Sequence, residues 1–278
     1  MRIHHLNCGT LRPFGSRLIN EAGSRFGAAR MVCHCLLVET EQGLVLIDTG
    51  MGVPDVTTHA ELMKRRLRLG RPVLDIAETA VSQVERLGYR AQDVRHIVPT
   101  HLDLDHAGGL PDFPHAEVHV HDVEYQAMRR DVAQDRYLHH QFRHGPKWRV
   151  HGSADGERWF GFEAVRDLPG LPPDILLVPL PGHTRGHTGV AVRQPSGKWL
   201  LNARDSYFYH GEVAPDRHCT PGLRFFQNLV QVDGALRRRT QERLHDLLTA
   251  HRDQIEVFCA HDAAELDRYA GSIEPSST

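Results

Sequence analysis

The chain has 278 residues, of which 40% are hydrophobic and 24% charged, and its 33 basic and 35 acidic side chains leave a formal net charge of −2. This composition is typical of a soluble globular protein, and it offers no basic surface for nucleic acid or an anionic membrane. No apolar run of about 18 residues occurs, so a membrane span is excluded, and the N-terminal segment lacks the apolar stretch of a signal peptide. We therefore expect a cytoplasmic protein with no nucleic-acid or membrane partner.

The first half of the chain alternates short apolar strands with a helical pattern. Segments 31–40 and 43–48 are separated by a short turn and predict a hairpin. Segment 74–87 carries apolar residues at helical spacing, which predicts a helix with one buried face that ends before Gly88. The remaining predicted elements are a buried strand at 96–100, a strand at 117–121 and a helix from Asp122 toward Arg130.

The second half repeats this outline. The predicted elements are a strand at 175–179, a hairpin of 188–192 with 198–202, a long helix at 229–250 and a buried strand at 255–260. Segment 131–173 shows no clean period and is interpreted as an irregular insertion, and the polar tail 271–278 is expected to fray. No linker separates the similar halves, about 31–130 and 175–262. We therefore expect a single domain, 1–278, of the α/β (α+β) class.

Histidine is the unusual residue of this composition, with 21 copies. Four candidate metal ligands stand within six residues after the third predicted strand, in the motif His101-Leu102-Asp103-Leu104-Asp105-His106. Alternation along the segment sends these side chains to different sides, which suits two adjacent ions. His183, Asp205 and His261 also follow predicted strands, whose ends converge on one edge of a sheet. Imidazole and carboxylate ligands of this kind are typical of catalytic zinc.

The five cysteines are odd in number, and none is spaced as CxxC. This pattern argues against a zinc ribbon and a disulfide framework, and we expect reduced thiols.

The ordered set of motifs resembles the metallo-β-lactamase superfamily from about residue 31 to residue 262. The matching pieces are DTG at 48–50, THLDLDHAGG at 100–109, PGHTRGH at 181–187, Asp205, and AHD at 260–262. The resemblance implies a four-layer αβ/βα sandwich with a binuclear metal site at one edge. By position, it implies a first metal on His101, Asp103 and His183. It implies a second on Asp105, His106 and His261, with Asp205 bridging the two.

Asp103 departs from the family, which usually has histidine at this position. The two divalent ions, three aspartates and one hydroxide of such a site sum to zero charge, whereas the usual pattern leaves one positive charge. A neutral cluster is expected to be a weaker Lewis acid and to suit harder ions. Zinc remains the default metal, and Asp103 makes iron or manganese the alternatives.

Within the superfamily, segment 33–52 and the HAGGL sequence at 106–110 are most similar to the N-acyl-homoserine lactonase group. The resemblance implies hydrolysis of an ester or lactone by a hydroxide shared between the ions. Asp105 would relay a proton to the leaving oxygen, and Tyr207 would donate a hydrogen bond to the oxyanion. Tyr209 is the alternative to Tyr207, and neither tyrosine has the offset that the group shows.

Other functions on the same fold remain open at this point. They are a thioesterase of glyoxalase II type, an iron-dependent oxidoreductase or dioxygenase, and a binding module whose site is disabled by Asp103. The oligomeric state also stays open, with a homodimer as one option.

Several other polar residues are interpreted as supporting, packing or surface residues rather than as metal ligands. Asp48 is expected to hydrogen-bond the metal-binding loop, and His187 to support a ligand rather than to be one. His119 and His121 are interpreted as packing residues and His151 as a solvated surface residue.

Overall fold

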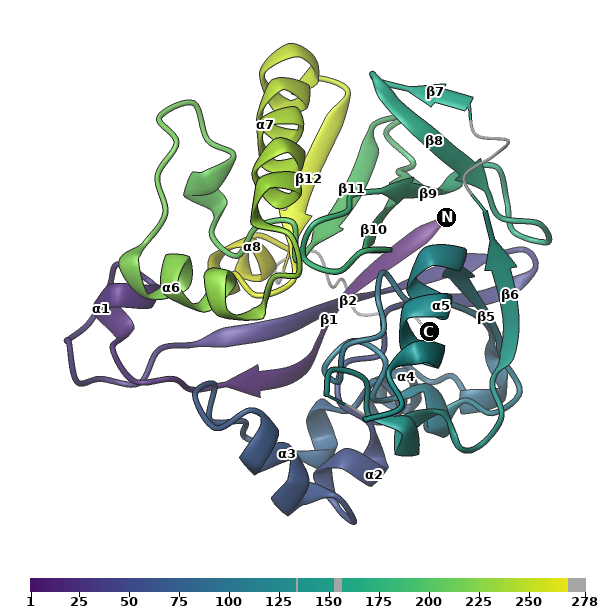
Figure 1. Ribbon diagram of the computed structural model, residues 1–278. Helices are drawn as coiled ribbons and strands as arrows, with labels where there is room; N and C mark the ends of the chain where they lie inside the picture. The colour runs from purple at the N-terminus through teal and green to yellow at the C-terminus, as the bar shows by residue number, and fades with distance from the viewer. Residues whose placement is uncertain (134, 153–156, 270–278) are drawn as a thin grey trace.

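The two halves of the sequence form two six-stranded sheets in the computed structural model, which describes residues 1–133, 135–152 and 157–269. The first sheet contains, in spatial order, β1 (Arg2–Leu11), β2 (Met31–Thr40), β3 (Gly43–Ile47), β4 (Val94–Val98), β5 (Glu117–His121) and β6 (Lys147–His151). The second contains, in spatial order, β12 (Ile255–Cys259), β11 (Trp199–Arg204), β10 (Thr188–Arg193), β9 (Ile175–Pro179), β8 (Phe162–Asp167) and β7 (Glu157–Trp159). Figure 1 shows the green and yellow second half above the purple and blue first half.

Both sheets are mixed. In the first sheet β1, β2 and β3 pair antiparallel, whereas β3 through β6 pair in parallel. In the second sheet only β11 and β12 are parallel. The parallel strands end at the same edge of their sheet, so the loops that follow them are brought together.

Helices cover the outer faces of the sheets and the edge where these loops meet. The α-helices of the described residues are α1 (Ser16–Ile19), α2 (Val53–Val56), α3 (Ala60–Arg66), α4 (Ala80–Arg86), α5 (Asp122–Arg130), α6 (Pro221–Val230), α7 (Gly234–His251) and α8 (Ala263–Asp267). Short 3-10 turns are η1 (Ile76–Glu78), η2 (Ala91–Asp93), η3 (Leu110–Asp112), η4 (His139–Phe142) and η5 (His210–Glu212). Within the described ranges, no helix has both the length and the apolarity that a membrane span needs.

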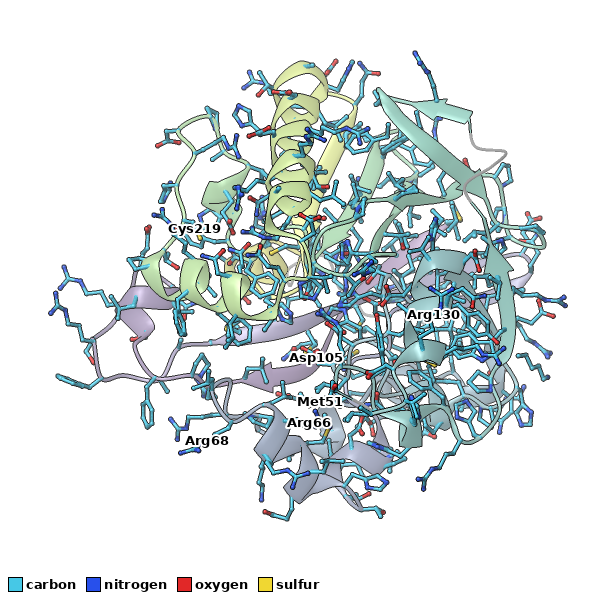
Figure 2. The ribbon with its side chains drawn as sticks, viewed as in Figure 1. Met51, Arg66, Arg68, Asp105, Arg130 and Cys219 are labelled. Atoms are coloured by element: carbon cyan, nitrogen blue, oxygen red, sulfur yellow. The ribbon has the colours of Figure 1, made fainter. Side chains whose placement is uncertain are left out.

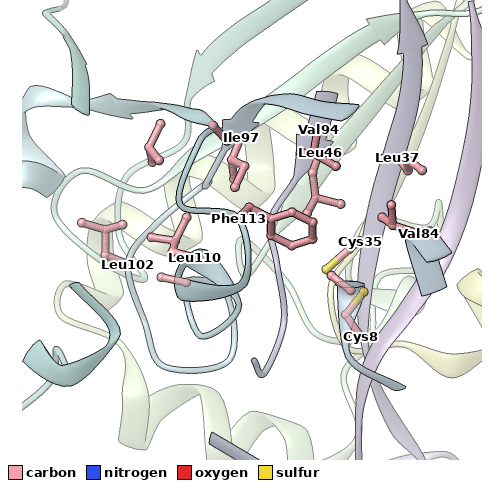
Figure 3. Packing of buried hydrophobic residues seen from close by; sticks show 14 of the residues in the cluster. Cys8, Cys35, Leu37, Leu46, Val84, Val94, Ile97, Leu102, Leu110 and Phe113 are labelled. Atoms are coloured by element: carbon pink, nitrogen blue, oxygen red, sulfur yellow. The ribbon is translucent and has the colours of Figure 1, made fainter. Parts of the chain in front are cut away.

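Three hydrophobic clusters define the layers. Leu36 and Val38 of β2 pack between the sheets with Leu177 and Val190, while the alternate residue Leu37 faces the helices. Figure 3 shows Leu37, Leu46 and Val84 of α4 on that outer side of the first sheet. The corresponding outer cluster of the second sheet joins Val178, Leu201 and Val257 to Leu244 and Leu247 of α7. The molecule is therefore the expected four-layer αβ/βα sandwich, with each fully buried leucine contributing roughly 2 kcal/mol.

The strands predicted from periodicity at 31–40, 117–121 and 175–179 have those bounds in the structure. β1 was not predicted, although it is the longest partner of β2. Its sequence is rich in histidine, asparagine and glycine, so its alternation is weak.

Two helix predictions need correction. Segment 74–87 is divided into η1 and α4, because the hydroxyl of Thr79 accepts from Ser82 N and starts a new helix. The helix predicted at 229–250 is α7, which begins at Gly234 and is separated from α6. Asp233 sets this start by accepting a hydrogen bond from Leu236 N at 2.9 Å.

Segment 131–173 is more regular than expected. It contains η4 and the strands β6, β7 and β8, and both β6 and β7 lie at sheet edges. Short edge strands need not alternate apolar and polar residues, which explains why periodicity did not reveal them. The tail predicted to fray lies outside the described residues.

Candidate metal centre

The seven candidate ligands converge where the two halves meet. His183 Nε2 lies 3.0 Å from Asp103 Oδ2 and 3.3 Å from Asp205 Oδ2. His106 Nε2 lies 3.5 Å from Asp205 Oδ1, and His261 Nε2 lies 3.3 Å from Asp205 Oδ2. Asp205 therefore stands between two groups of potential ligands. The first group is His101, His183 and Asp205, and the second group is His106, Asp205 and His261. Asp105 lies beside the second group.

The residues present fit metal ions. His101 Nε2, His106 Nε2 and Asp205 Oδ1 are buried and have no hydrogen-bond partner. A buried polar atom left in this state costs about 1–3 kcal/mol, and a cation bound among these atoms would satisfy all three. Imidazole nitrogen and carboxylate oxygen are ligands that zinc, iron and manganese all accept.

Each ligand is placed by a strand end or the turn that follows it. The loop from Thr100 to His106 continues from β4, His183 follows β9, Asp205 follows β11 and His261 follows β12. The backbone turns sharply at the end of β11 and also after β3, where Arg204 and Asp48 have φ values of 47° and 55°. Both are non-glycine residues in the left-handed region, and the surrounding contacts hold them there.

Asp48 is the buried hub behind the second group of ligands. Its carboxylate accepts from Thr100 N at 2.6 Å, from Thr100 Oγ1 at 2.8 Å and from His106 Nδ1 at 3.0 Å, and it pairs with Arg204. Burial alone would raise the pKa of Asp48, but Arg204 and His106 lower it to about 2. The expectation that Asp48 orients the metal-binding loop is confirmed, because its contact with His106 Nδ1 turns Nε2 toward the centre.

Two other histidine rings are oriented by contacts between their Nδ1 atoms and backbone carbonyl oxygens. His261 Nδ1 lies 2.8 Å from the carbonyl oxygen of Val32, which leaves Nε2 directed at Asp205. His187 Nδ1 contacts the carbonyl oxygen of Leu180 at 2.8 Å, and its Nε2 accepts from Asp205 N at 3.3 Å. His187 thus supports Asp205 from the backbone side, as the sequence predicted.

Arg136 was not predicted, and it is the closest charged neighbour of Asp103. Its Nε and Nη2 donate to the two carboxylate oxygens of Asp103 at 2.6 and 2.5 Å, and Nη2 also lies 3.0 Å from His183 Nε2. Nη1 donates to the carbonyl oxygen of Val230 at 2.8 Å, which fixes the guanidinium against α6. Arg136 belongs to the segment that showed no period, so no sequence signal connected it with the site.

This contact changes the charge balance expected from Asp103. The neutral cluster predicted from the sequence counted the metal ligands alone. The guanidinium of Arg136 adds one positive charge in direct contact with the extra carboxylate, so the surroundings return to the balance of a site with histidine at that position. The neutral sum predicted for the metal ligands alone stays a prediction, and it leaves out the charge of Arg136, whose donors contact both carboxylate oxygens of Asp103.

Glu124 connects the two ligand-bearing loops. This buried carboxylate accepts from Leu102 N at 3.0 Å, from Thr184 Oγ1 at 2.6 Å and from Gly186 N at 3.2 Å. Burial raises its pKa despite these donors. The loop that carries Asp103 is thereby held against the loop that carries His183.

A cavity of about 370 Å³ opens above this centre. Asp103, Asp105, His183, Asp205 and His261 form its polar end. Its apolar wall consists of Leu11, Leu67, Leu69, Leu104, Phe208, Phe226, Leu229 and Val230, and Arg66, Arg68 and Arg136 also line it. Figure 2 shows Asp105 near the middle of the molecule and Arg68 nearer the periphery, beside α3.

The structure does not bring Tyr207 to this cavity. The Tyr207 ring is buried in the hydrophobic cluster under α7, and its hydroxyl donates to Glu265 at 3.2–3.3 Å. The alternative, Tyr209, donates to Glu21 at 2.7 Å and is also absent from the cavity wall. The role expected for Tyr207 is thus corrected: the residue that the loop after Asp205 turns into the cavity is Phe208.

One thiol, that of Cys33, lies beside the candidate metal ligands. Cys33 Sγ is 3.9 Å from Asp105 Oδ2 and groups with Asp105 and His261 as a third set of potential ligands. All five cysteines are free, as the sequence predicted.

Comparisons with known proteins agree with this description. Residues 29–201 match the model of the metallo-beta-lactamase superfamily. A "probable metallo-hydrolase" of Mycobacterium tuberculosis is 40% identical over 265 residues, which are 94% of this chain and 80% of that protein. An N-acyl homoserine lactonase of Bacillus cereus is 29% identical over 177 residues, which are 62% of this chain and 63% of that protein.

A solved N-acyl homoserine lactone hydrolase with the product N-hexanoyl-L-homoserine bound at its catalytic metal centre has the same fold. The TM-score is 0.72 over 96% of this chain and 95% of that one, at 19% identity. The layered fold and the family match define a protein of the metallo-hydrolase class. The chain belongs to the metallo-beta-lactamase superfamily.

Proposed function

We propose that this protein is a metal-dependent hydrolase that opens an ester or lactone, with two divalent ions held by the seven converging side chains. The observation that carries the proposal is the position of Asp205, whose carboxylate stands between two separate groups of potential ligands. The similarity to proteins named N-acyl homoserine lactonase supports a lactone as the substrate class.

Bound divalent ions would polarise the carbonyl group and activate water at neutral pH. The side chains of the protein would transfer the proton, position the ligands and exclude water. Asp105 lines the cavity, and we infer that it accepts a proton from the attacking water and returns it to the leaving oxygen. Arg136 holds Asp103 by both oxygens and keeps its carboxylate beside His183. Phe226, Leu229 and the other apolar wall residues exclude water and can receive an acyl chain.

The carboxylate of Asp103 favours a second candidate. An oxygen ligand in place of imidazole suits iron or manganese better than an imidazole-rich site does, so an iron-dependent oxidoreductase remains the alternative. A thioesterase of glyoxalase II type would use the same hydrolytic arrangement. Zinc is the default ion for the proposed lactonase.

One assay separates these activities. Protein loaded separately with zinc, manganese or iron is offered lactones, thioesters and phosphodiesters in a pH-indicator assay, and oxygen uptake is recorded with the iron form. Acid release from lactones supports the proposal. Oxygen consumption by the iron form, without acid release from any ester, would replace it with the oxidative reaction.

The first prediction concerns the shared ligand set. Asp205→Ala and His183→Ala should each lower metal content and reduce lactone opening by more than about 100-fold, because each removes a ligand from the centre. His115→Ala and Asp246→Ala are matched controls, since both residues are exposed and absent from the cavity wall. Metal analysis and initial rates are the measurements, and a wild-type rate in either site variant would refute the assignment.

A further inference from the structure

A second cluster of histidines lies on the first sheet, outside the cavity. His96 Nδ1 is 3.0 Å from His119 Nε2, and His119 Nδ1 is 3.1 Å from His151 Nε2. A carboxylate oxygen of Glu117 joins His96 and His119 in a group whose ligand atoms all lie within 4.8 Å of one another. None of these four residues lines the cavity of the candidate metal centre.

Strand register produces the cluster. His96 of β4 is the direct partner of Glu117 on β5, and His119 follows Glu117 on the same face. His151 on β6 is paired with His121, one pleat further along that face. This is the face that Val98 of β4 presents to the second sheet, so the imidazoles stand at the border of the core between the sheets.

The environment of the cluster differs from the sequence-based expectations. His119 does not pack as an apolar residue, because both of its ring nitrogens contact other imidazoles. His151 is not solvated, since only 8% of its surface is exposed. Burial lowers the pKa of His119 to about 3 and also lowers the pKa of His96, which keeps both rings neutral and able to donate a lone pair to a cation at pH 7.

The contacts permit the tautomer that a metal ligand needs at His119, whereas His96 Nδ1 then carries the proton that it shares with His119 Nε2, and a bound ion would shift that proton to His96 Nε2. If His119 Nδ1–H donates to His151 Nε2, the lone pair of His119 Nε2 faces His96 Nδ1 and Glu117. A metal-bound histidine characteristically donates its other ring N–H to an acceptor in this way. Tetrahedral zinc with Zn–N bonds of 2.0–2.1 Å requires ligand atoms about 3.3 Å apart, and the His96–His119 separation is close to that value.

The charged residues around the histidine cluster and its access from solvent also allow an ion to bind. Arg149 Nη2 and Nε donate to the two carboxylate oxygens of Glu117 at 2.6 and 3.0 Å, but the Arg149 side chain is 59% exposed and can move into solvent, which would free the carboxylate for an ion. A surface hollow lined by Glu117, Arg149, His151 and Gly170, among others, gives an ion a path to the cluster.

We propose that His96, Glu117 and His119 form a second metal site, separate from the candidate catalytic centre, that binds one divalent ion of the imidazole-preferring class. The class comprises Zn²⁺, Ni²⁺ and Cu²⁺, which two imidazoles and one carboxylate suit better than Mg²⁺ or Ca²⁺. His151 orients His119 from the neighbouring strand. The ion links β4 to β5 and, through His151, holds the edge strand β6 in register.

The test compares metal stoichiometry in the full-length protein. Wild type and His96→Gln are dialysed against buffered Zn²⁺, and bound zinc is measured after the free ion is removed. We expect His96→Gln to bind one equivalent fewer than wild type, whatever the occupancy of the catalytic centre. His115→Gln is the matched control, since it removes an exposed histidine outside the cluster and should bind as much zinc as wild type.

Two further readouts locate the ion. Cu²⁺ added to wild type should give an electron paramagnetic resonance spectrum with coupling to two nitrogens, and this component should be missing in His96→Gln. Zn²⁺ should also raise the Tm of wild type more than that of His96→Gln, because the ion binds only the folded strands. Circular dichroism checks that His96→Gln is folded, and His119→Gln is needed only if it is not.

Equal zinc content in folded wild type and His96→Gln, or loss of an equivalent without loss of the copper–nitrogen component, would overturn the second site. Neither result depends on the proposed hydrolase activity, because the comparison is a difference in bound metal between two variants with the same seven catalytic ligands.

Discussion

At the scale of single residues, the contact between Asp103 and Arg136 distinguishes this centre from the usual family pattern. A carboxylate replaces the family's histidine, and a guanidinium stands against it with two hydrogen bonds. The carboxylate and the guanidinium compensate in charge, so we expect the effects of substituting Asp103 and Arg136 to be coupled. An Asp103→His substitution would restore the family's histidine and leave the guanidinium of Arg136 beside the imidazole of His183 without its carboxylate partner.

We therefore predict opposite results for a single and a double variant. Asp103→His alone should lower zinc affinity by about tenfold, because the charge of Arg136 is no longer offset and opposes the ion. Asp103→His combined with Arg136→Met should recover binding and prefer zinc over manganese more strongly than wild type does. Competition between the two ions in equilibrium dialysis measures both effects.

Arg66→Met supplies the control for removing a cavity arginine, since Arg66 is exposed and donates to the carbonyl oxygen of Asp135. Combined with Asp103→His, it should rescue nothing. Zinc affinity in Asp103→His that equals that of the double variant with Arg136→Met would show that the guanidinium does not influence the centre.

At the scale of elements, the junction between β12 and α8 contains a buried carboxyl group, that of Glu265. Glu265 accepts from Cys259 N at 2.6 Å and from the hydroxyl of Tyr207, while Arg268 reaches it from the surface at 2.7 Å. Burial and the nearby charge of Asp262 raise the pKa of Glu265 to about 7. This junction supports the loop that carries His261.

The raised pKa predicts how stability varies with pH. The folded state holds the Glu265 proton more tightly than the unfolded chain, so this residue's contribution is greatest below its unfolded pKa of about 4.5 and is lost as pH rises through about 7. The predicted loss is about 3 kcal/mol over that range. Urea unfolding at pH 5, 6, 7 and 8 should show a flatter profile for Glu265→Gln than for wild type.

Glu242→Gln, on the exposed face of α7, is the appropriate comparison and should keep the wild-type profile. Parallel profiles for wild type and Glu265→Gln would mean that the buried carboxyl does not titrate in this range.

At the scale of the whole molecule, the cavity exists only because the two halves face each other. Leu67 and Leu69 follow α3 of the first half, whereas Phe226, Leu229 and Val230 belong to α6 of the second. Asp105 comes from the first half and Asp205 from the second, so both the apolar wall and the polar end are shared. A substrate in this position touches both halves at once.

We predict that Leu67→Ala and Leu229→Ala each raise the KM of a long-chain acyl lactone about fivefold, with little change in kcat. Each removes apolar contact worth about 1 kcal/mol from the wall without touching the polar end. Short-chain lactones should respond less, because their acyl groups do not reach that wall. Ile76→Ala, which removes an exposed apolar side chain outside the cavity, should leave both constants unchanged. An equal effect on short and long chains would place the acyl group elsewhere.

The sequence was most informative where chemistry is local. Strand 31–40 is a continuous apolar segment that is buried on both faces of its sheet. The motif from His101 to His106 follows directly after a strand. Both features could therefore be recognised within a few residues. Prediction failed where the outcome depended on a distant partner. The helix expected from 229 was broken by a cap at Asp233, and Tyr207 was turned into the core by packing under α7.

The amino-acid sequence by itself determined most of the strands and the ligand-bearing motifs, because strand periodicity and ligand spacing are properties of short segments. Through their resemblance to the metallo-β-lactamase superfamily, the ordered motifs also implied the layered fold and the seven residues that gather at the centre. Only the tertiary structure decided which groups surround those ligands. Arg136 reaches Asp103 across 33 positions of the chain, and His96, His119 and His151 meet only through the register of three adjacent strands. Electrostatic and hydrogen-bonded contacts depend on separation in space, which the order of residues along a chain does not specify.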